Sequence, residues 1–189
     1  MNMERCTLEK NGFEAVYFPG TISSLKAVIS VGGASCDEKM SISMRGSYVR
    51  QDIRLPKDLV QIHVDYVEKA VKRLKEEKKI KGIAMTDIST RAAYTLLAAS
   101  FIPDIGCIIP VVPYNYILAE TWLSTTRKTL GYGIRRFMRF GYDKMEKRQL
   151  PEARIKVENM HADVLFLAVK NDDAWSSDIA VPRMVKIGN

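Results

Sequence analysis

Histidine and cysteine are scarce in this chain of 189 residues. It has two histidines, His63 and His161, and three cysteines, Cys6, Cys36 and Cys107. The cysteines are odd in number and widely spaced, with no CxxC pair, so they indicate neither a disulfide framework nor a zinc site. We expect reduced, structural cysteines, no metal and no cofactor. The two histidines limit every catalytic hypothesis that needs an imidazole base.

Long apolar runs are missing as well. No stretch reaches the roughly 18 consecutive apolar residues of a membrane-spanning helix. The N-terminus, MNMERCTLEKNGFE, carries charges where a signal peptide needs an apolar segment. With 11 glycines and 7 prolines, the chain is neither collagen-like nor of low complexity. We expect a cytoplasmic, soluble protein, a single domain over residues 1–189, and no membrane partner.

Basic residues outnumber acidic ones by 29 to 22, which gives a formal charge of +7. They gather in residues 69–81 and 127–154. In the first segment glutamates are interleaved with the lysines, which predicts the solvated face of a helix. The second has few acids and several aromatics, so it fits either a solvated helical insertion or an anion site. The charge would suit nucleic acid, but no nucleic-acid-binding module is recognisable, and we expect no such partner.

Hydrophobic periodicity predicts an α/β fold. Short apolar strands are expected at 25–31, 79–86, 105–112 (interrupted by Pro110) and 162–169. Helices are expected from Pro56 to about Leu74 and over 90–100, the first with an apolar face that includes His63. Apolar strands alternating with helices indicate a mostly parallel sheet covered on both faces, a three-layer α/β/α sandwich. The basic segment at about 114–154 falls between two strands, as a cap-like insertion would.

Functional residues of a parallel sheet collect on loops at the carboxyl ends of its strands. Three loops stand out there: Gly32 to Ser35, Asp87 to Arg91, and Lys170 to Trp175. The glycine pair would let backbone N–H groups approach a ligand oxygen closely. Ser89 would stand at a helix N-terminus, where the dipole favours an oxyanion. The alternative for Ser89 is a simple helix N-cap, a position that serine favours.

Residues 81–100 resemble the nucleophile elbow and following helix of α/β-hydrolases. The resemblance is closest to the catalytic domain shared by acyl-CoA thioesterases and bile acid-CoA:amino acid N-acyltransferases. Three further segments agree in order and spacing: residues 25–35 with the strand and Gly-Gly oxyanion loop, 55–59 with the Leu-Pro entry to a helix, and 155–177 with the strand and Asp-x-x-Trp loop. Together they cover about three quarters of the chain.

The resemblance implies a role for individual residues. Ser89 corresponds to the nucleophile, and Asp172 to the acid that orients a catalytic histidine, with Asp173 able to substitute. The backbone N–H groups of Gly33 and Thr90 correspond to the oxyanion hole. The implied substrate is a small-molecule acyl thioester or ester such as acyl-CoA, and the substrate-binding candidates are basic side chains: Arg91, Arg135 and Arg136.

The chain departs from the family pattern in several places. The elbow is usually Gly-x-Ser-x-Gly, because residues two before and two after the serine are crowded; here they are Asp87 and Arg91. Arg91 could neutralise Asp87, or the pair could block the pocket. No histidine follows His161, which should lie at the opposite end of the sheet from Asp172. Residues 36–55 are short for the helix and strand that the family has there, and we expect no final strand and helix.

These departures leave a second function open. A divergent homologue could keep the scaffold and lose the chemistry, acting as a binding module or as a subunit completed by another chain. The sequence also leaves assembly into a homo-oligomer open.

Overall fold

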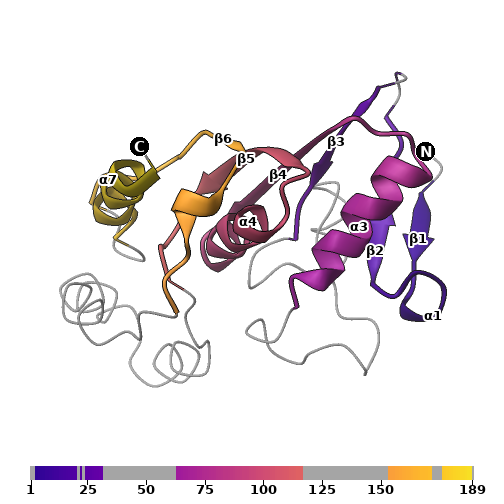
Figure 1. Ribbon diagram of the computed structural model, residues 1–189, viewed down its shortest axis with the longest axis horizontal. Helices are drawn as coiled ribbons and strands as arrows, with labels where there is room; N and C mark the ends of the chain where they lie inside the picture. The colour runs from indigo at the N-terminus through magenta and orange to yellow at the C-terminus, as the bar shows by residue number, and fades with distance from the viewer. Residues whose placement is uncertain are drawn as a thin grey trace.

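The computed structural model describes residues 3–20, 22, 24–31, 63–116, 153–171 and 176–188 (Figure 1). Its main feature is a four-stranded sheet in the order β3-β4-β5-β6, in which every neighbouring pair is parallel. The strands are β3 (Lys26–Ile29), β4 (Gly82–Ile88), β5 (Ile105–Val111) and β6 (Asp163–Val164). Each overlaps a strand expected from the sequence, and β4 continues to Ile88, two residues beyond the expected end. The α/β class with a parallel sheet is confirmed.

Helices connect and flank these strands (Figure 1). Helix α3 (Asp65–Glu76) precedes β4, α4 (Thr90–Phe101) joins β4 to β5, and α7 (Ser177–Gly188) follows β6. A short 3-10 helix, η3 (Val157–Asn159), precedes β6. At the N-terminus, β1 (Glu4–Cys6) and β2 (Ala15–Tyr17) form a separate antiparallel pair around helix α1 (Leu8–Asn11), and this unit lies beside α3.

One hydrophobic core joins α3 and α4 to the sheet. Val67, Val71 and Leu74 recur at steps of four and three along α3, so they share one buried face. Helix α4 is rich in alanine, a strong helix former, and most of its described side chains are buried. Small side chains allow this helix to approach β4 and β5 closely. The elements on either side of residue 89 are therefore firmly packed.

The two faces of the sheet differ in exposure. Ala27 and Ile29 of β3 pack against the core, whereas Val28, between them, is exposed. The same alternation follows β6, where Val164 packs against the core and Leu165 is exposed. The third layer of helices expected from the sequence would cover the face that carries Val28, and it is not part of the described residues.

Two expected elements differ in detail. Pro110 does not interrupt β5 but lies within it, opposite Asp87 of β4. Its carbonyl accepts a hydrogen bond from the Leu167 amide at 3.1 Å, and Pro110 falls where pairing with the β6 segment is sparse, so a missing N–H is tolerated. Helix α3 begins at Asp65, after an exposed His63 that is not helical; residues 56–62 lie outside the described residues.

Helix α7 was not expected from the sequence. Its interior Pro182 disfavours a helix prediction, yet Ala180 and Met184, four residues apart, are both buried and hold it to the core. In the described residues α7 follows β6 without a further strand, so the expectation about a final strand and helix stays a prediction.

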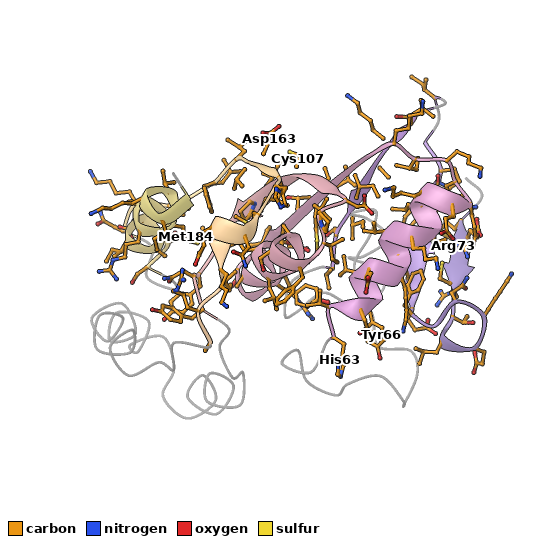
Figure 2. The ribbon with its side chains drawn as sticks, in the orientation of Figure 1. His63, Tyr66, Arg73, Cys107, Asp163 and Met184 are labelled. Carbon is orange, nitrogen blue, oxygen red and sulfur yellow. The ribbon has the colours of Figure 1, made fainter. Side chains whose placement is uncertain are left out.

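The solvated face expected at residues 69–81 is covered in part by the N-terminal unit. Arg73 pairs with Glu4 and Glu77, and its side chain is only 11% exposed. Lys78 also pairs with Glu4 and lies 5.0 Å from the ring centroid of Tyr17. Figure 2 shows Arg73 on the side of α3 next to β1 and β2. Arg73 and Lys78 thus hold the N-terminal unit against α3, whereas other lysines of the segment are exposed as expected: Lys69, Lys72, Lys75 and Lys79.

The ends of the basic segment lie together. Tyr116 and Arg154 form an antiparallel bridge, and the Ile155 amide donates to the Asn115 carbonyl at 3.0 Å. The chain thus leaves and returns at one place beside the sheet, which is the geometry an insertion requires. Residues 117–152 lie outside the described residues, so the cap-like insertion stays a prediction.

Candidate active site

Ser89 is the turn between β4 and α4. Strand β4 ends at Ile88 and α4 begins at Thr90, so the chain changes direction at this residue. Ser89 has φ 63° and ψ −126°, outside the main regions allowed to L-amino acids. Such a conformation costs about 1–3 kcal/mol and persists only where the surrounding structure holds it. The serine therefore stands in a strained strand-to-helix turn.

The backbone of Ser89 is held from both sides. Its N–H donates to the Val111 carbonyl at the end of β5, at 2.9 Å, and its carbonyl accepts from the Ala92 amide at 3.0 Å. The Ser89 side chain, however, makes no capping hydrogen bond to α4. The simple N-cap alternative requires such a bond, so the geometry does not support it. The backbone amide of Thr90 belongs to the first turn of α4, whose N–H groups have no acceptor within the helix.

Asp87, two residues before Ser89, is almost fully buried and 4% exposed. Its carboxylate accepts hydrogen bonds from the Ser30 hydroxyl at 2.9 Å and the Val31 amide at 2.8 Å. The Thr95 hydroxyl of α4 lies at 3.5 Å. The side chain that replaces the usual glycine thus finds room toward the end of β3 and the core-facing side of α4. Sequence reasoning identified the departure but not its partners, because residues 30 and 87 are distant in sequence.

Arg91, two residues after Ser89, is also buried, at 3% exposure. A carboxylate and a guanidinium of opposite charge therefore flank the serine symmetrically along the chain, both withdrawn from solvent. Burial of a charge is costly unless it is compensated, so each of these two charges requires compensating partners within the fold. The role of Arg91 in substrate binding stays a prediction.

The two histidines lie at opposite ends of the sheet. Ser89 is level with Val111 of β5, whereas Asp163, two residues after His161, is level with Cys107. At about 3.3 Å per residue along a strand, His161 and Ser89 are separated by roughly 20 Å. His161 is therefore too far away to take a proton from this serine, as its place in the sequence indicates.

His63 lies at the carboxyl end of the sheet, opposite His161. Helix α3 leads into the amino end of β4, so its own N-terminus lies at the carboxyl edge of the sheet, where Ser89 is found. The Tyr94 hydroxyl of α4 donates to the His63 carbonyl at 2.9 Å, which ties the two helices together near this edge. Figure 2 shows His63 at the start of α3. The expectation of a half-buried histidine on an apolar helix face is wrong, because His63 precedes the helix and is exposed.

The loop after β6 is held at both described ends. The Val169 amide donates to Ser177 Oγ at 3.3 Å, and the Asn171 amide donates to Asp178 Oδ2 at 3.2 Å. Asn171 itself has φ 58°, a turn conformation. The start of α7 thus holds the chain immediately before residue 172. Asp172 lies outside the described residues, as do Gly33, Arg135 and Arg136.

Among the residues that the structure describes, no group of three or more His, Cys, Asp or Glu side chains is placed to hold a metal ion. Within the same ranges, no helix combines the length and apolar character needed to cross a bilayer. Cys6 and Cys107 are free thiols, and burial raises the pKa of the Cys6 thiol. None of these features adds a reactive group beside Ser89.

A parallel sheet in which a strand passes through a strained serine directly into a buried helix is the arrangement of α/β-hydrolases. Comparison with known proteins identifies the branch. The model of the family "BAAT / Acyl-CoA thioester hydrolase C terminal" matches residues 62–186, about two thirds of the chain, and the chain belongs to this family.

A curated relative agrees with this assignment. The chain is 25% identical over 183 residues to the mouse (Mus musculus) protein named peroxisomal succinyl-coenzyme A thioesterase. The match covers 86% of this chain and 42% of the relative. The chain thus spans less than half the length of that protein.

Proposed function

We propose that the protein is a serine hydrolase of the acyl-CoA thioesterase type, which cleaves an acyl thioester or ester through Ser89. The observation that carries the proposal is the strained backbone of Ser89, at the β4–α4 turn of a chain from this family. A serine whose only task is to cap a helix adopts relaxed backbone angles and bonds the first turn with its side chain. Ser89 does neither, so its strain supports a catalytic role.

The chemistry follows from the position of the serine. Ser89 Oγ attacks the thioester carbonyl carbon, its proton passes to a base, and the C–S bond breaks to release the thiol. Water then attacks the acyl-serine ester, giving a carboxylic acid and restoring the serine. The N–H groups of Thr90 and Gly33 hold the oxyanion, aided by the positive end of the α4 dipole. The Val31 amide donates to the Asp87 carboxylate. Gly33 comes two residues after Val31 in the sequence, and Ser89 comes two residues after Asp87.

In this proposal Asp172 orients the imidazole that serves as base. The described neighbours of Asp172 support this role, since Asn171 is held to the start of α7 at the end of the segment that runs parallel to β5. Of the two histidines in the sequence, His63 lies at the same edge of the sheet as Ser89.

The substrate class rests on the family and the relative. The family is named for acyl-CoA thioester hydrolysis, and the relative is named as a thioesterase for succinyl-coenzyme A. CoA carries phosphates, so Arg135 and Arg136 of the basic segment are the proposed contacts to them. Arg91 is 3% exposed, so its proposed contact is with the part of the substrate that reaches the turn at Ser89. The cytoplasmic location expected from the sequence stays a prediction. The name of the relative, by contrast, places that protein in the peroxisome.

A second candidate is a homologue that binds acyl-CoA without cleaving it. It is favoured by the replacement of both small elbow residues by the buried charges Asp87 and Arg91. In that case the Ser89 hydroxyl lacks an activating base and does not react with a fluorophosphonate probe. Covalent labelling of Ser89 decides between the two candidates.

Hydrolysis is tested by incubating the protein with a series of acyl-CoA substrates and a thiol reagent. Ser89→Ala should abolish thiol release, because in this proposal Ser89 Oγ is the acyl acceptor. Ser100→Ala is the matched control. Ser100 lies on α4, about 16 Å from Ser89, and its hydroxyl donates to the Leu97 carbonyl. The Ser100→Ala protein should therefore release thiol at the wild-type rate. Release that persists in Ser89→Ala would rule out the proposed nucleophile.

A further inference from the structure

The Asp87 carboxylate links three parts of the site region. One oxygen accepts from the Ser30 hydroxyl, and the other accepts from the Val31 amide and faces the Thr95 hydroxyl of α4. Ladder pairing between β3 and β4 is described as far as Ile29 opposite Met85. The side chain of Asp87 therefore continues the hydrogen bonding between the strands two residues beyond the last ladder pair.

The residue is well suited to hold a fixed geometry. Asp87 is 4% exposed and Thr95 is fully buried, so water does not compete for these bonds. Bonds to a charged acceptor are stronger than bonds between neutral groups. A glycine at position 87, as in the usual elbow, would leave the Val31 amide and the Ser30 hydroxyl without this acceptor. A buried carboxylate here is a specific link between the end of β3 and the turn that carries Ser89.

We propose that Asp87 is a positioning residue, which fixes the turn that carries Ser89, and with it the Thr90 amide, relative to the end of β3. This inference rests on the proposed function, because the position of Ser89 and of the Thr90 amide as an oxyanion donor matters only if Ser89 attacks a carbonyl. Asp87 acts through the backbone of Val31 and does not itself touch the substrate. In the usual elbow no side chain at this position makes such a link.

The link predicts a particular kinetic effect. Oxyanion donors act mainly in the transition state, so displacing them lowers kcat and leaves KM nearly unchanged. Loss of one well-placed donor costs about a hundredfold to a thousandfold in kcat, and a displaced donor should cost less, about tenfold to a hundredfold. Asp87→Ala should show this loss. Asp87→Asn retains the shape and an acceptor oxygen for the Val31 amide, so its kcat should stay within about threefold of wild type.

The experiment compares Asp87→Ala, Asp87→Asn and Ser30→Ala with wild type in acyl-CoA thiol release, with kcat and KM measured separately. Ser30→Ala removes one bond and keeps the Val31 bond, so it should fall between wild type and Asp87→Ala. Asp104→Ala is the control for loss of an aspartate, since Asp104 is an exposed partner of Lys75 remote from this link. Amide hydrogen exchange over residues 25–31 reports the link independently of activity, and Asp87→Ala should speed exchange at Val31.

A loss of kcat at constant KM in Asp87→Ala, rescued in Asp87→Asn, with faster exchange at Val31, supports the inference. Two results overturn it while the proposed function stands: faster exchange at Val31 with unchanged kcat, or an Asp87→Asn variant as impaired as Asp87→Ala although folded. If wild type releases no thiol and Ser89 takes no phosphonate label, the proposed function fails and the positioning role fails with it. If Asp87→Ala does not fold, the milder Asp87→Asn and Ser30→Ala variants decide by the same criteria.

Discussion

The backbone N–H of Ser89 donates to the Val111 carbonyl at 2.9 Å, and this bond holds the turn of β4 against the end of β5. Together with packing of α4, it stabilises a backbone conformation that serine would otherwise avoid. The strain at Ser89 is thus maintained by its neighbours. This relationship leads to a test that separates stability from catalysis.

Replacing Ser89 by glycine should stabilise the protein by about 1 kcal/mol, because glycine adopts positive φ without steric cost. The same change should abolish thioester cleavage. Thr7 offers a contrast: its side chain does cap a helix, accepting from the Lys10 amide, so Thr7→Gly should leave stability equal or lower. Denaturant unfolding measures both variants. A Ser89→Gly protein less stable than wild type would show that the side chain of Ser89 contributes to the fold.

His161 should be dispensable for reaction at Ser89. The strand register separates the two by roughly 20 Å, well beyond the reach of a proton transfer. His161→Gln should therefore label with a fluorophosphonate at the wild-type rate. A large loss of labelling in a folded His161→Gln protein would contradict the register of β6 against β5.

The strands of the sheet could be predicted from the sequence, whereas the side-chain contacts of the candidate site could not. The strands are predicted correctly because continuous apolar runs leave few alternatives, and the turn at Ser89 follows from the abrupt junction of a strand with an alanine-rich helix. The hydrogen bonds from Ser30 and Val31 to Asp87 join residues that are 57 and 56 positions apart in the sequence. A local sequence pattern does not reveal contacts over such a separation. Helix α7 was not predicted; it contains Pro182, a residue that is disfavoured in helix interiors, and it is held by the burial of Ala180 and Met184.

Acid should weaken the attachment of β1 to α3. The hydrogen bond from Lys78, together with the charges of Lys78 and Arg73, lowers the pKa of Glu4 below its usual value. A carboxyl group with a lowered pKa stabilises the fold above its unfolded pKa, near 4.5, and this contribution is lost as pH falls through its folded pKa. Glu4→Gln should remove that part of the pH dependence. Thermal unfolding between pH 6 and 3 measures it, and identical pH profiles for wild type and Glu4→Gln would argue against the contact.

High pH should lower the stability of the fold through ionisation of Tyr114. Burial raises the pKa of its hydroxyl to about 12 from a usual value of 10. The unfolded chain therefore loses this proton before the folded one does, so stability is intact below pH 10 and declines as pH rises from 10 toward 12. Tyr114→Phe should flatten this decline. Absorbance titration of the tyrosinates, alongside unfolding at each pH, should show a late-titrating group that is missing from the variant.

The central claim is that Ser89 is an acyl-accepting nucleophile, and mass spectrometry of the acyl-enzyme tests it most directly. The protein is mixed with acyl-CoA, quenched within the first turnovers and digested. The account predicts an acyl group on the peptide that contains Ser89, present in wild type and Ser100→Ala and missing in Ser89→Ala. Thiol release without acylation of Ser89, or an acyl group on another residue, would contradict it.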